Sequence, residues 1–170
     1  MLFTAGSHAW AALPDEEVIL KKGGKDAQVL IEKAYDILEN AEVFASQAVG
    51  YAGSPTRDCW ALTVIVRYDS QALKRLAALY EETSQPETKL YAITGLIALD
   101  PKQKAKFAPP DFPAKLRDTP VQTMNGCVVD TRKTFGVAVG ELEEAGPSAY
   151  LYQKLPSIYR ATEVRRFKTE

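Results

Sequence analysis

Apolar residues recur every three or four positions between about Asp26 and Val49, which is the repeat of an amphipathic helix. Most charged residues of this segment fall away from the apolar stripe, as a surface helix requires. Gly50 and Gly53 follow, and glycine readily takes the left-handed conformation that closes a last helical turn. The pattern therefore predicts one long helix, whose buried stripe comprises Leu30, Ala34, Ile37, Ala41, Phe44 and Ala48.

The segment from Cys59 to Val66 is almost wholly apolar, which is typical of an element buried on most sides. Its β-branched residues also allow a strand. Ser54 and Pro55 before it favour a helix, because serine can cap free amides and proline suits the first helical turn. We predict a buried helix here.

Two further helices are predicted on either side of residues 84–85. Ser84 and Glu87 have the spacing of a capping box, in which each side chain bonds the backbone amide of the other residue. The loop between the helices is short, so the two helices are expected to run antiparallel. Their shared core is predicted to contain Leu73, Leu76, Leu90, Ile93 and Ile97.

This predicted pair, over about residues 71–99, resembles one unit of a HEAT- or armadillo-type helical repeat. The resemblance implies stacked helix pairs, but no second copy follows at a fixed period, whereas stacked repeats need several units. The predicted fold class is therefore mainly α, an irregular bundle of antiparallel helix pairs with a small β-hairpin near residues 121–129.

Proline and glycine set the expected organisation after the helix pair. Asp100 is expected to cap a short helix, and four prolines between Phe107 and Pro120 predict an extended loop. Asn125-Gly126 predicts a type I′ turn, since both residues tolerate positive φ. After the hairpin, Asp130 is expected to cap a last helix that ends near Glu144, with Phe135, Ala138, Val139 and Leu142 facing inward. In that helix, Gly136 and Gly140 have the spacing that allows another helix to pack closely.

Length and composition indicate a single domain of ordinary soluble type. The chain has 170 residues, with 46% apolar and 25% charged side chains. We expect one helical domain over residues 1–170, with an N-terminal arm (1–25) and a C-terminal tail (147–170) docked on it. The 21 basic and 22 acidic side chains argue against nucleic acid as the main ligand, because proteins that bind nucleic acid usually carry a basic excess. No apolar run approaches the ~20 residues of a membrane span.

The N-terminus and the two cysteines leave the cellular compartment open. Ala9-Trp10-Ala11 has the small-x-small form of a signal-peptidase site, but the basic region that precedes such a site is missing. Both a periplasmic or exported protein and a cytoplasmic protein fit this pattern. Cys59 and Cys127 belong to no C-x-x-C unit and have apolar neighbours, so we expect them to be structural, either as buried thiols or as one disulfide.

No catalytic or cofactor motif is found. The sequence has a single histidine, His8, and no G-x-S-x-G elbow. The glycines before Lys25 resemble a phosphate loop, but Ile19 and Asp26 occupy positions where that motif needs glycine and Ser or Thr. We therefore predict no cofactor, no metal and no catalytic residue.

The function predicted on this basis is that of a non-enzymatic protein-binding module, such as a bacterial-type adaptor or a toxin-neutralising immunity protein. Two alternatives stay open. One is a small enzyme whose site is assembled from distant residues such as Cys127, Asp130 and His8. The other is a structural subunit of a homo-oligomer.

The predicted partner-binding surface is the proline-rich loop together with the adjoining hairpin. Loops of more than about twelve residues are uncommon in compact domains and are often functional. The apolar anchors would be Phe107, Phe112 and Leu116. Lys106, Lys115 and Arg117 would form a basic rim suited to an acidic protein surface, and Asn125 would contribute from the hairpin. The alternative is a passive connector whose phenylalanines cover the core.

Overall fold

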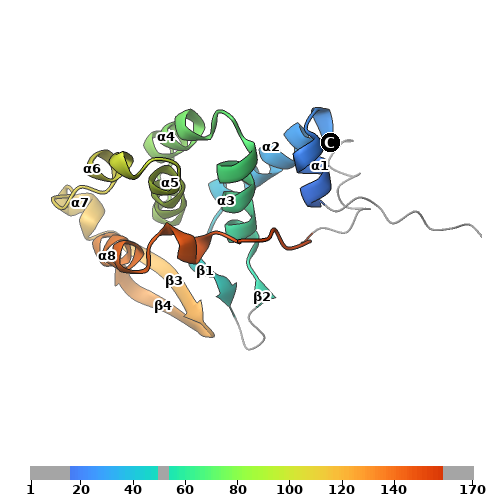
Figure 1. Cartoon of the computed structure of the whole chain (residues 1–170). Coiled ribbons are helices and arrows are strands. Elements are labelled where there is room, and N and C mark those ends of the chain that lie inside the picture. Colours follow the sequence, from blue (N-terminus) through green and yellow to red (C-terminus); the bar gives the residue numbers. More distant parts are fainter. Residues whose placement is uncertain (1–15, 50–53, 159–170) are drawn as a thin grey trace, which may run out of the picture.

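The computed structural model describes residues 16–49 and 54–158, in which a cluster of helices packs on a small β-sheet (Figure 1). The prediction of a mainly helical fold is confirmed. The α-helices are α1 (Glu16–Lys22), α2 (Lys25–Glu39), α3 (Arg57–Tyr68), α4 (Ala72–Glu82), α5 (Pro86–Leu99), α6 (Lys104–Phe107), α7 (Ala114–Arg117) and α8 (Phe135–Ala145). The strands are β1 (Phe44–Val49), β2 (Ser54–Pro55), β3 (Pro120–Gly126) and β4 (Val128–Thr134), and the short 3-10 helices are η1 (Pro101–Gln103) and η2 (Pro147–Tyr150).

Helices α3 and α5 form the centre of the core. The prediction of a buried helix over residues 59–66 is confirmed, since every residue from Cys59 to Ile65 is buried in α3. Helix α5 is buried continuously from Leu90 to Leu96. Gly95 lets α5 approach its neighbours, because a Cβ at this position would lie 2.6 Å from Leu76 Cδ1 and 3.0 Å from Leu62 Cδ1.

The prediction of one helix over residues 26–49 is wrong. Helix α2 ends at Glu39, after which the backbone N–H of Asn40 donates to the Ile37 carbonyl and the N–H of Ala41 donates to the Leu38 carbonyl. The Asn40 side chain donates to the Asp36 carbonyl and so completes the helix end. From Phe44 to Val49 the chain is the strand β1.

Strand β1 is fixed by a buried tyrosine of α5. The Tyr91 hydroxyl accepts the N–H of Ala45 at 2.9 Å and lies 3.2 Å from the Val43 carbonyl oxygen, to which it can donate. In the sheet, whose strand order is β2-β1-β3-β4, β1 runs parallel to β3 and the other pairs are antiparallel. The expected isolated hairpin is thus half of a larger sheet, which helices α3, α5 and α8 contact.

The hairpin is present, but its turn lies one residue later than predicted. Asn125 pairs with Val128, so the two turn residues are Gly126 and Cys127. Gly126 has a φ of +58°, whereas no described residue other than glycine has a positive φ. The predicted type I′ turn is therefore wrong, because that turn needs positive φ at both central residues.

The region between α4 and α5 also departs from the sequence pattern. The predicted capping box is absent: Gln85 is the N-cap residue of α5, and the Glu87 carboxylate accepts the backbone N–H of Gln122 on β3 at 2.7 Å. Leu73, predicted to lie in the core, is 42% exposed, whereas Ile93 has no exposed surface.

Of the two aspartates predicted to cap helices, one does so and the other does not. The Asp100 cap is confirmed, since its Oδ1 accepts the N–H of Lys102 at 3.0 Å. Asp130 caps no helix, because β4 continues to Thr134 and α8 begins at Phe135. The predicted inward face of α8 is confirmed: Phe135, Ala138, Val139 and Leu142 are buried.

The two ends of the described chain pack on α3. Near the start, the indole N–H of Trp60 donates to the buried carboxylate of Glu16 at 2.9 Å. Near the end, Arg67 donates to the carbonyls of Tyr152 and Gln153. The predicted signal-peptidase pattern and His8 lie outside the described residues. None of the helices that the structure describes is long and apolar enough to cross a membrane.

Cys59 and Cys127 are both free thiols, so they form no disulfide, and the expectation that Cys127 is buried is wrong. Cys127 is exposed at the hairpin turn. Cys59 is buried in α3, where its thiol donates to the Ala45 carbonyl at 3.1 Å, and burial raises the pKa of this thiol to about 12.

We therefore expect a thiol reagent at neutral pH to modify Cys127 of the native protein and leave Cys59 intact, because only the accessible thiol can reach the reagent. Peptide mass spectrometry after brief iodoacetamide treatment measures this. Denatured protein is the control, in which both residues should react. Equal modification of both residues in native protein would contradict the buried environment of Cys59.

Candidate functional site

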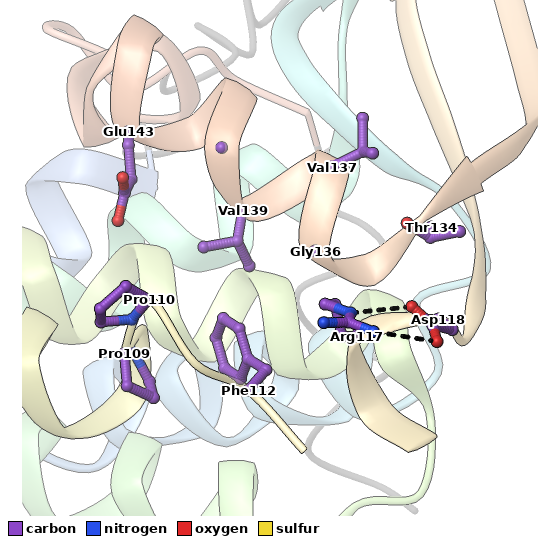
Figure 2. Close-up of a pocket in the computed structure, with 11 residues that line it drawn as sticks. Pro109, Pro110, Phe112, Arg117, Asp118, Thr134, Gly136, Val137, Val139 and Glu143 are labelled. Carbon is purple, nitrogen blue, oxygen red and sulfur yellow. Dashed lines mark hydrogen bonds and ion pairs between the residues drawn. The ribbon is translucent and has the colours of Figure 1, made fainter. Parts of the chain in front are cut away.

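A groove of about 430 Å³ lies between the proline-rich loop and helix α8. Figure 2 shows Pro109, Pro110 and Phe112 facing Val139 and Glu143 of α8. The lining of the groove is largely apolar. It comprises Pro109, Pro110, Phe112, Arg117, Asp118, Thr134, Gly136, Val137, Val139, Gly140 and Glu143.

The loop is held in place by packing and one backbone bond. The Phe112 ring packs edge-to-face on Phe135, with ring centroids 5.4 Å apart. Beyond α7, the N–H of Phe135 donates to the carbonyl of Thr119 at 2.8 Å. Four of the residues between Phe107 and Pro120 form helix α7, so the loop is less extended than its prolines predict.

Glycines of α8 determine the shape of the groove. A Cβ at Gly136 would lie 2.7 Å from Arg117 Cγ, so only glycine lets α7 pack this closely. A Cβ at Gly140 would meet nothing within 4 Å. The prediction that another helix packs on these glycines therefore holds for Gly136, which α7 covers, while Gly140 faces open space.

The charges at the groove are already paired within the chain. Arg117 Nε lies 2.9 Å from Asp118 Oδ1, and this hydrogen bond raises the pKa of Arg117 and lowers the pKa of Asp118. Glu143 lies 3.2 Å from Lys104 Nζ of α6. These two ion pairs neutralise the charged residues of the lining, so the groove presents mainly apolar surface to a ligand.

The structure separates the residues that the sequence placed on one surface. Phe112 and Arg117 line the groove. Phe107 is buried and packs edge-to-face on Tyr80, so it cannot serve as an anchor for a partner. Leu116 is half-buried against the core, and Lys115 is exposed on α7.

Two further members of the predicted surface lie elsewhere. Lys106 covers the ring of Phe107, with its Nζ 4.5 Å from the ring centroid. Asn125 is exposed at the far end of β3 and lines a different hollow, beside Tyr150. The hairpin tip is therefore not continuous with the groove.

Sequence reasoning missed the residues that α8 contributes to the groove. Val137 is 52% exposed, although it directly precedes Ala138 and Val139, which belong to the correctly predicted inward face. A large apolar residue on the outward face of an amphipathic helix is a signal that could have marked this surface. Gly140 and Glu143 also line the groove, whereas the sequence pattern predicts for Gly140 only close packing of another helix.

Within residues 16–49 and 54–158, no three His, Cys, Asp or Glu side chains lie close enough together to hold a metal ion. Cys127 and Asp130 are both on the hairpin, where the Asp130 carboxylate accepts the backbone N–H of Arg132 at 2.9 Å. Comparison of the chain with family models, with curated proteins and with solved structures gives no match.

Proposed function

We propose that this protein is a non-enzymatic binding module that holds another protein in the groove between the proline-rich loop and α8. The observation that carries the proposal is the open, largely apolar groove whose charged residues are already paired within the chain. An adaptor or a toxin-neutralising immunity protein would use a surface of this kind. The occupant we propose is a short apolar segment of the partner.

The proposed anchor points are Val137 and the open side of Gly140. Burying an exposed valine contributes favourable free energy at an interface, because apolar surface leaves water. Gly140 has room for an incoming side chain. Lys115 on α7 makes no ion pair with any described residue, so it would favour an acidic side chain next to the apolar segment.

The scaffold of this module is, in our proposal, a helix pair of the HEAT type formed by α4 and α5. Three residues connect the two helices. Late residues of α4 meet early residues of α5, since Lys89 donates to the Tyr80 carbonyl, and Gly95 packs on Leu76 nearer the start of α4. These contacts support an antiparallel arrangement.

Filling the groove tests the proposed function. The variant Gly140→Leu places a side chain in open space on a helix, so the fold should be kept, and leucine has the better helix propensity. We expect the variant to lose a stoichiometric partner that co-purifies with the tagged wild-type chain. The amount of partner recovered per tagged chain should fall at least about tenfold, because an occluded groove cannot bury the partner's apolar anchor.

The matched control is Ala78→Leu, which adds a leucine side chain at an exposed position of α4 that lies outside the groove. This variant should retain the partner at wild-type stoichiometry. Partner binding unchanged in Gly140→Leu, with an unchanged circular dichroism spectrum, would exclude the groove as the binding site.

A further inference from the structure

A second hollow, of about 520 Å³, lies between the sheet and the C-terminal half of α8, and its observations are independent of the groove. In Figure 1, α8 lies against β3 and β4, and η2 follows α8 directly. The floor of the hollow is apolar: the rings of Phe44 and Tyr150 stack with centroids 4.5 Å apart, and Met124 also lines the hollow.

Two hydroxyl groups open into this hollow without a hydrogen-bond partner among the described residues. Tyr150 is 8% exposed and Thr123 is 6% exposed, and both residues line the hollow. No described side-chain nitrogen or oxygen that is fully shielded from solvent lacks a partner, so each of these hydroxyls has contact with solvent. Burial raises the pKa of Tyr150 to about 12, so at neutral pH its hydroxyl is protonated and its oxygen can accept a hydrogen bond.

The charges around the hollow leave one carboxylate in excess. Lys133 Nζ lies 2.6 Å and 2.7 Å from the two carboxylate oxygens of Glu141, so this pair is internally neutral. Glu144 also lines the hollow and makes no ion pair or hydrogen bond with any described residue. The hollow thus combines a negative charge, two hydroxyl acceptors and an aromatic floor.

From these features we infer that the hollow is a binding site for a guanidinium group. A guanidinium is planar and stacks on aromatic rings, and its five N–H donors suit several acceptors at once. The Glu144 carboxylate would pair with the charge, the hydroxyls of Thr123 and Tyr150 would accept N–H groups, and the apolar floor of the hollow would lie against the group. The guanidinium can come from an arginine side chain of another protein or from a free small molecule.

The test is an NMR titration of the full-length ¹⁵N-labelled protein. N-acetyl-arginine amide presents the group as a peptide does, methylguanidine presents it as a free cation, and N-acetyl-citrulline amide is the neutral isostere. We expect saturable shifts of the backbone amides of Thr123, Asn125 and Tyr150 with a guanidinium probe and not with the citrulline probe. Saturation with the arginine amide alone identifies a peptide-borne source, and equal or tighter binding of methylguanidine identifies a small molecule.

Two variants separate binding from folding. Glu144→Gln removes the charge at an exposed position, and Tyr150→Phe removes only the hydroxyl while keeping the ring stacked on Phe44. Each should weaken the guanidinium probe about tenfold, as loss of a hydrogen bond to a charged group predicts. The matched control Glu143→Gln changes the neighbouring carboxylate, which faces the groove, and should leave the affinity unchanged. Equal response to the citrulline probe, absence of saturable shifts, or unchanged affinity in both variants would overturn the assignment.

Discussion

Replacing Ile93 with alanine is expected to lower the free energy of unfolding by about 2 to 5 kcal/mol. Ile93 lies in α5 and has no exposed surface. Its truncation removes apolar atoms from the core and leaves a cavity that the closely packed neighbours can only partly fill. Urea unfolding followed by circular dichroism measures the change. The m-value, which is the slope of the unfolding free energy against urea concentration, should stay unchanged, and this would show that the folded state keeps its compactness.

Leu73→Ala is the matched control for this prediction. The hydrophobic pattern places both residues in one predicted core, but Leu73 is 42% exposed on α4. Its truncation should change the unfolding free energy by no more than about 0.5 kcal/mol, as expected for a surface position. Equal losses in the two variants would show that α4 and α5 bury different faces from those described here.

The sequence was most informative where an element is buried on nearly all sides or is closed by a local signal. Helix α3 was predicted because its apolar run is continuous and Ser54-Pro55 precedes it. The inward face of α8 followed from its period, and its predicted end near Glu144 agrees with the structure, in which Gly146 with a φ of +73° follows the helix. These signals come from residues close together in the chain, so sequence reasoning could use them.

Where a distant residue determines the local structure, the sequence pattern failed. Ala41, Phe44 and Ala48 continue the helical repeat of α2, yet residues 44–49 form a strand. The backbone of β1 is bonded to Tyr91 of α5 and pairs with β3, and both partners are far away in the chain. Hydrophobic periodicity describes only neighbouring residues, so it cannot predict bonds to distant ones. Such tertiary contacts override local propensity.

Glu87 illustrates the same limit at a single side chain. Its spacing from Ser84 is that of a capping box, but its carboxylate bonds a backbone amide of β3 instead. The competing partner lies 35 positions further along the chain. A local motif therefore predicts a bond that the folded chain replaces with a longer-range one.

Only one of the two walls of the candidate groove could be predicted from the sequence. The proline-rich loop marks one wall, which includes Phe112 and Arg117. The other wall consists of outward-facing residues of α8, and tertiary contacts such as the packing of Phe112 on Phe135 bring the two walls together. A site formed between two segments needs their relative placement, which composition and spacing do not provide.

Replacing Tyr91 with phenylalanine is expected to destabilise the protein by about 1 to 3 kcal/mol, because it leaves a buried backbone donor without its acceptor. The Tyr91 hydroxyl accepts the N–H of Ala45, a buried residue of β1, and lies within hydrogen-bond distance of the carbonyls of Val43 and Ala45. The phenylalanine ring keeps the apolar contacts, including the edge-to-face contact with Phe44, whose ring centroid is 4.9 Å away. The loss therefore reports on the hydrogen bonds alone.

The control for this change is Tyr80→Phe, which removes a half-buried hydroxyl that makes no hydrogen bond with a described residue. Its effect on the unfolding free energy should be no more than about 0.5 kcal/mol. Hydrogen exchange adds a local measurement: in Tyr91→Phe the amide of Ala45 should exchange faster than in the wild-type chain, because opening of β1 needs less free energy once its anchor on α5 is removed. If the two tyrosine variants are equally stable and the Ala45 amide keeps its protection, the hydroxyl does not hold β1 in place, and the strand depends on its pairing with β3 alone.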